Sequence, residues 1–168
     1  GSAGHGQTFY VTLGDVGVNE VGQCVELSPL GTQLVGGYRN DSALVMEVDL
    51  AGAVSWAYTF KPTLLPAVVV DLTITPDNFI IGCGTGRSPI PPVSQEIFYF
   101  KMDLLGNVLW TMRSTDPRPV YATRIEAPTA AEYILFSDIY DLGAATSADM
   151  VRERIDAATG TVIWDSPR

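Results

Sequence analysis

The sequence predicts an all-β fold made of three copies of one four-stranded antiparallel unit. The three tryptophans are spaced 54 residues apart, at Trp56, Trp110 and Trp164. A glycine lies four residues before each tryptophan, and an aspartate lies three or four residues before each glycine: Asp49 and Gly52, Asp103 and Gly106, Asp156 and Gly160. Markers that recur in one order at a fixed period indicate a structural repeat. Glycine (16) and proline (11) are frequent and no segment keeps a 3.6-residue apolar period, so very little helix is expected.

Runs rich in Val, Ile, Tyr, Phe and Thr, bounded by turn residues, predict four strands in each copy. In the first copy these are residues 24–28, 33–39, 43–49 and 54–60. In the second copy they are residues 68–75, 79–84, 97–103 and 108–114, with the glycine-rich run 82–86 as a flexible exit from the second strand. In the third copy they are residues 121–127, 133–138, 149–156 and 161–165. Between the third and fourth strands, the aspartate can bond turn amides while the glycine takes a positive φ, which predicts a tight hairpin.

Four antiparallel strands repeated every 40 to 55 residues or so are typical of a β-propeller blade. One such sheet cannot cover both of its faces, so neighbouring blades must stack, and the tryptophans are expected to fill the wedges between them. Residues 1–6 are interpreted as a tag or disordered lead. Residues 7–168 are predicted to form the repeat domain, with blades at about 22–60, 68–114 and 121–168.

Three blades are too few to close a ring, because propellers typically have four to eight. Residues 7–13 alternate apolar with other side chains and predict one extra N-terminal strand, from a preceding blade. We therefore expect a partial ring, either part of a longer chain or completed by other copies. The third blade departs from its siblings, since Glu153 replaces Met46 and Phe100 and lies between two arginines. Its third strand is interpreted as either an ion-paired, solvent-facing strand or a polar contact surface for a partner.

The segment from Asp156 to Trp164, D-A-A-T-G-T-V-I-W, resembles the D-x-x-T-G-x-x-x-W tryptophan-docking motif of quinoprotein-like propellers. The segments 49–56 and 103–110 lack the threonine and are one residue shorter. They resemble the K-L-D-x-x-G-x-x-x-W repeats of secreted and cell-surface bacterial propellers. The resemblance covers about residues 22–168 and implies an extracellular or cell-surface location. Two lysines and an acidic balance agree with this location.

Few residues are suited to catalysis. His5 is the one histidine and lies in the lead, and no P-loop, G-x-G-x-x-G or EF-hand pattern is present. Cys24 and Cys83 are expected to be buried thiols, with a disulfide as the alternative. Asp71, Glu26 and Glu126 lie on first strands, which line the channel of a propeller, where an acidic hydrated lining is expected and a bound cation is the alternative. We expect no enzyme activity, no cofactor and no metal.

Composition also restricts the partners. A net charge of −9 argues against nucleic acid, and no apolar run approaches the ~18 residues that span a membrane. Long loops gather at one end of the predicted sheets, where recognition usually occurs. The candidate ligand-binding residues on this face are Tyr38, Asn40, Asp41, Arg87, Glu96, Asp116, Arg118, Tyr140, Asp141 and Asp149. The sequence thus predicts a non-catalytic module that binds a protein or a glycan. A self-assembling structural subunit and a fragment of a quinoprotein-like enzyme are the alternatives, although the vicinal cysteine pair of the latter is absent.

Overall fold

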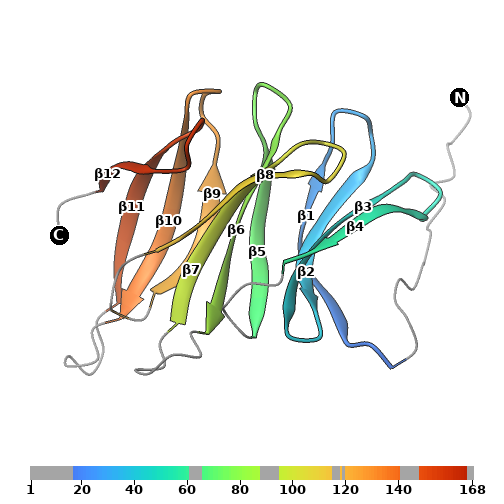
Figure 1. Ribbon diagram of the computed structural model, residues 1–168, viewed down its shortest axis with the longest axis horizontal. Helices are drawn as coiled ribbons and strands as arrows, with labels where there is room; N and C mark the ends of the chain where they lie inside the picture. Colours follow the sequence, from blue (N-terminus) through green and yellow to red (C-terminus); the bar gives the residue numbers. More distant parts are fainter. Residues whose placement is uncertain are drawn as a thin grey trace, which may run out of the picture.

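Three four-stranded antiparallel sheets stand side by side along the chain (Figure 1). The computed structural model describes residues 17–60, 66–87, 95–114, 118, 120–140 and 148–165. Within these residues there are twelve strands and no helix, and none of the sheets closes into a barrel, so the predicted all-β class is confirmed. The arrangement is consistent with propeller-like blades. The lead 1–6 and the expected strand 7–13 lie outside the described residues.

Each sheet follows chain order, and we call the three sheets the first, second and third blades. The first blade contains β1 (Glu20–Leu27), β2 (Gln33–Arg39), β3 (Ser42–Val48) and β4 (Val54–Thr59). The second contains β5 (Ala67–Ile74), β6 (Ile80–Arg87), β7 (Gln95–Met102) and β8 (Val108–Arg113). The third contains β9 (Val120–Glu126), β10 (Glu132–Tyr140), β11 (Ala148–Asp156) and β12 (Val162–Asp165).

Strand β6 differs from the prediction, because it continues to Arg87 instead of ending near residue 84. The glycine-rich run is therefore not a flexible exit but paired strand, with Gly82 opposite Phe100 and Gly84 opposite Phe98. A Cβ atom on either glycine would overlap the ring of its partner phenylalanine. The glycines thus leave space for two buried phenyl rings on the neighbouring strand.

The hydrophobic core lies between the blades. Leu34 and Val45 of the first blade pack against Phe98 and Phe100 of the second, with the ring of Phe60 4.4 Å from that of Phe100. A second cluster fills the space between the second and third blades and contains Ile81, Tyr99, Tyr133, Leu135 and Ile155. The first strands β1, β5 and β9 contact each other in series, as the inner strands of stacked blades would.

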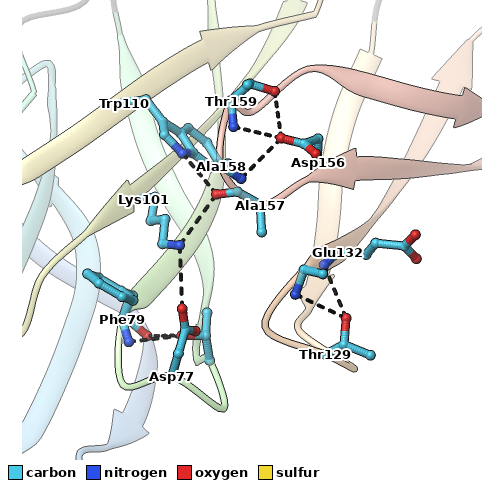
Figure 2. A network of polar contacts seen from close by, with 12 residues as sticks. Asp77, Phe79, Lys101, Trp110, Thr129, Glu132, Asp156, Ala157, Ala158 and Thr159 are labelled. Carbon is cyan, nitrogen blue, oxygen red and sulfur yellow. Dashed lines mark hydrogen bonds and ion pairs between the residues drawn. The ribbon is translucent and has the colours of Figure 1, made fainter.

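Two tryptophans join each blade to the next. The indole Nε1 of Trp56 donates to the carbonyl of Leu104 at 3.2 Å, and that of Trp110 donates to the carbonyl of Ala157 at 3.3 Å (Figure 2). In both cases the acceptor is the residue directly after the repeated turn aspartate. The indoles also lie over the turn glycines, since a Cβ on Gly106 would come within 2.8 Å of Trp56 Cε3. The side chain of Trp164 lies outside the described part of the structure.

The turns that receive these indoles have a common hydrogen-bond pattern. Asp103 accepts from the amides of Leu105 at 2.9 Å and Asn107 at 2.8 Å, and Gly106 has a φ of 86°. The side-chain amide of Asn107 also donates to Asp103, and this bond lowers the pKa of the carboxyl. A stable carboxylate satisfies the turn amides, so the turn presents its next carbonyl to the incoming indole.

Candidate functional site

A groove opens between the first and second blades, at the end of the sheets that carries the β2–β3 turn (the lower end in Figure 1). It has a volume of about 580 Å³. Residues from all three blades line it: Asn19, Gln23, Tyr38, Asn40, Asp41, Pro66, Ala67, Val68, Val70, Thr85, Gln95, Tyr121 and Ala122. Its walls therefore combine two tyrosines with four amide side chains and one described carboxylate.

The rim of the groove is held by local hydrogen bonds. The amide of Asn40 donates to the carbonyl of Asn19 at 2.6 Å, and the Asn40 side-chain oxygen accepts from the Asn19 amide at 3.2 Å. Asn40 has a φ of 53°, a left-handed conformation that asparagine tolerates better than most residues. The amide of Ala67 donates to the carbonyl of Asp41 at 2.9 Å, which ties the turn to the start of β5.

The far wall of the groove comes from the third blade. The amide of Ala122 donates to the hydroxyl of Thr85 at 3.0 Å and so joins β9 to β6. Next to it, the ring of Tyr121 meets the ring of Tyr140 edge to face at 5.2 Å. Both tyrosines are exposed, at 39% and 44%, so the pair offers aromatic surface at the groove's edge.

The structure brings together three of the residues chosen from sequence, Tyr38, Asn40 and Asp41. A fourth, Tyr140, stands at the edge of the groove through its contact with Tyr121. The remaining described candidates do not line it: Arg87, Glu96, Arg118 and Asp149. Among these, Glu96 forms an ion pair with Arg113 of the neighbouring strand β8. Asp116 and Asp141 lie outside the described residues.

Sequence reasoning missed several lining residues, chiefly Gln23, Gln95 and Tyr121. They lie on strands β1, β7 and β9, whereas most of the residues predicted from the sequence lie in loops. A usable signal was present, because Tyr121 is the first residue of the predicted strand 121–127 and Gln95 lies two residues before the predicted strand 97–103. Polar and aromatic residues at the strand ends of the loop-rich face are therefore as good candidates for ligand binding as the loop residues themselves.

The three carboxylates expected near the axis share a second hollow of about 360 Å³. Asp71 accepts a hydrogen bond from the amide of Ile125 at 2.8 Å and so links β5 to β9. Burial raises the pKa of Asp71, and burial together with the charge of Asp71 raises the pKa of Glu26. Glu126 pairs with Arg124 at 3.0 Å. Within the described residues, no group of three or more histidine, cysteine, aspartate or glutamate side chains is placed to hold a metal ion.

Both cysteines are free thiols. Burial raises the pKa of Cys24 to about 12, and burial also raises the pKa of Cys83 well above its usual value. Such thiols are protonated at neutral pH, so they are poor nucleophiles. They act as small packing residues, Cys24 on the inner strand β1 of the first blade and Cys83 on the second strand β6 of the second blade.

The polar strand of the third blade has two different faces. On strand β11, Glu153 shares a face with Val151 and Ile155, which are buried against the second blade. Arg154 points to the opposite face, where its Nε donates to Glu132 of β10 at 3.1 Å. The strand thus combines an ion-paired outer face with an inner face that is packed.

No protein-family model matches the sequence, and no curated protein is similar enough to match it. In the described part of the chain, no helix is long and apolar enough to cross a membrane.

Proposed function

We propose that this chain is a non-catalytic, propeller-type module of a secreted or surface protein that binds a glycan in the groove between the first and second blades. The observation that carries the proposal is the groove's lining, in which Tyr38 and Tyr121 stand beside Asn19, Gln23, Asn40 and Gln95. Concave sites of several hundred Å³ with apolar surface and a few polar groups are typical of small-ligand recognition. The location follows from the resemblance of the repeats to secreted and cell-surface propellers.

A sugar ring matches this lining chemically. Its C–H faces are apolar and pack on aromatic rings, while its hydroxyl groups exchange hydrogen bonds with amides and carboxylates. Asparagine and glutamine each offer both a donor and an acceptor, as a hydroxyl requires. The Asn40 side chain accepts a hydrogen bond from the Asn19 amide, and backbone hydrogen bonds of Asn40 and Asp41 hold the turn that carries both residues in place before a ligand arrives.

Binding without hydrolysis agrees with the carboxylates of the groove. Glycosidases use two carboxyl groups on opposite sides of the bond that breaks. Among the described lining residues, Asp41 is the single carboxylate. The candidates Asp71 and Glu26 line the separate hollow instead.

A glycan array followed by calorimetry on the best oligosaccharide tests the proposal. Tyr38→Ala should weaken the affinity at least tenfold, about 1.4 kcal/mol, because it removes one aromatic wall. Tyr58→Ala is the matched control, since Tyr58 is 38% exposed and does not line the groove. Absence of any glycan ligand, or equal affinity of the Tyr38→Ala variant and the unmodified protein, would contradict the proposal. A protein ligand in place of a glycan would likewise contradict it.

A further inference from the structure

The first blade carries a turn of the kind that receives a tryptophan in the other two blades. Asp49 accepts from the amides of Ala51 and Ala53, both at 2.8 Å, and Gly52 has a φ of 84°. The second blade's turn has the same pattern around Asp103, with a φ of 86° at Gly106. Among the described residues, the tryptophans that dock on such turns are Trp56 and Trp110, and these occupy the second and third blades' turns.

The residue that would present its carbonyl in the first blade's turn is Leu50. It is 76% exposed. At the matching positions, Leu104 packs against the core between the first and second blades, and Ala157 is 3% exposed. The first blade's turn thus has the geometry of an acceptor and exposes a leucine where its siblings are covered.

The sheet face beside this turn is apolar and exposed in the same way. Val25, Leu72 and Ile125 hold one position in the repeat, as the strand registers show, opposite Val35, Gly82 and Leu135. Leu72 and Ile125 are 4% and 1% exposed because the preceding blade covers them, whereas Val25 is 64% exposed. Leu27, two residues on, is 66% exposed. A blade of the same kind would fit this face.

The third blade supplies the other half of such a contact. Trp164 pairs in register with Arg154, as Trp56 does with Glu47 and Trp110 with Lys101. The Lys101 ammonium donates to the carbonyl of Ala157 at 3.4 Å, beside the Trp110 indole (Figure 2). Arg154 holds the position in the third blade that Lys101 holds in the second. The third blade therefore carries a tryptophan and a cation at the two positions from which the second blade donates hydrogen bonds to the turn of its neighbour.

We propose that two copies of this chain associate head to tail, with Trp164 and Arg154 of each copy docking on the 49–53 turn and the Val25–Leu27 face of the other. The contact continues an interface that the chain itself builds twice, and it buries the apolar face that water now meets. Two copies supply six blades, within the four to eight with which propellers close. This association goes beyond the proposed glycan binding and does not depend on it.

Sedimentation equilibrium over a wide concentration range tests this proposal. The unmodified chain should approach twice its 18.1 kDa mass, and Leu50→Asp and Trp164→Ala should each shift the dissociation constant at least tenfold toward monomer. Leu105→Asp is the matched control, because Leu105 is 77% exposed in the equivalent turn of the second blade and should leave the mass unchanged. Circular dichroism verifies that each variant is folded, and Leu50→Asp, a change in an exposed turn, keeps the test valid if Trp164→Ala fails to fold.

Mixing the two variants distinguishes head-to-tail docking from other association. The Leu50→Asp copy retains its Trp164, and the Trp164→Ala copy retains its 49–53 turn, so one intact contact forms between them. The mixture should therefore contain more dimer than either variant alone. A chain that stays monomeric at every concentration overturns the proposal. The exposed face at Val25 and Leu27 would then be covered by something other than a second copy. Equal loss of dimer in Leu105→Asp, or no recovery on mixing, also overturns it.

Discussion

At the scale of single residues, two aspartates show how position within a blade decides the role of a carboxylate. Asp71 lies on an inner strand, where burial raises its pKa even though it accepts a hydrogen bond from Ile125. Asp103 lies in an exposed turn, where the Asn107 side chain and two backbone amides lower its pKa. The first carboxylate therefore costs stability when ionised, and the second contributes stability when ionised.

Replacing each aspartate by asparagine should have opposite effects on the free energy of unfolding at pH 7. The pKa of Asp71 is raised in the folded state, so its carboxyl contributes fully to the stability of the fold at pH values below 3.8, the ordinary pKa of an aspartate. That contribution is lost as the pH rises through the pKa of the folded state. Asp71→Asn should therefore stabilise the protein at neutral pH, and the gain should vanish near pH 3. Urea denaturation at both pH values measures it, and a loss at pH 7 would contradict the assignment.

Asp103→Asn is the paired experiment with the reverse sign. The pKa of Asp103 is lowered in the folded state, so its carboxylate contributes to the free energy of unfolding at pH values above 3.8, the ordinary pKa of an aspartate. That contribution is lost as the pH falls through the pKa of the folded state. The variant should be less stable than the unmodified protein at pH 7, and the difference should narrow toward pH 2. A difference that does not depend on pH would show that the charge of Asp103 is not what stabilises the turn.

At the scale of elements, the turn glycines serve two purposes at once. Gly106 takes a positive φ that closes the hairpin, and its missing side chain lets the Trp56 indole approach. Gly31, in the β1–β2 turn, has a similar φ of 82° but no atom within 4 Å of where a Cβ would lie. Comparing these two glycines separates the cost of the backbone conformation from the cost of disturbing the indole.

Gly106→Ala should destabilise the protein more than Gly31→Ala does. Both variants place an alanine in the left-handed region, at a cost of about 1 kcal/mol. Only Gly106→Ala also displaces an indole, which loses a hydrogen bond and packing, for about 1 kcal/mol or more in addition. Urea denaturation gives both free energies of unfolding. Equal losses would mean that the indole is not held against the glycine.

The sequence predicts the strands well because each is a β-rich run that ends at turn residues, and the tryptophan period aligns the copies. The predicted end of β6 is wrong, because glycines are typical of loops, whereas Gly82 and Gly84 lie within the strand and leave space for the rings of Phe100 and Phe98. Nearness to the loop-rich face sufficed to find Tyr38, at the end of the predicted strand 33–39, and Asn40 and Asp41, in the turn after it. It did not find Tyr121, because that residue reaches the groove through the stacking of one blade on another, which no local pattern records.

At the scale of the whole molecule, the blades depend on one another for a core. The two buried clusters each draw residues from two neighbouring blades, so no blade encloses a core of its own among the described residues. Polar contacts cross the same boundaries, with the Tyr99 hydroxyl donating to the carbonyl of Gly160 at 3.1 Å. Stacked repeats of this kind gain stability from interfaces as well as from the individual units.

We expect the docking of the Trp56 and Trp110 indoles on the next blade's turn to be what fastens neighbouring blades together. Hydrogen exchange read by mass spectrometry on the Trp56→Ala variant tests it most directly, because it reports protection blade by blade. The substitution should cost about 3 kcal/mol, and amide protection should fall most in β1–β4 and remain in β9–β12. Uniform loss across all three blades, or unchanged protection in the first, would contradict the claim.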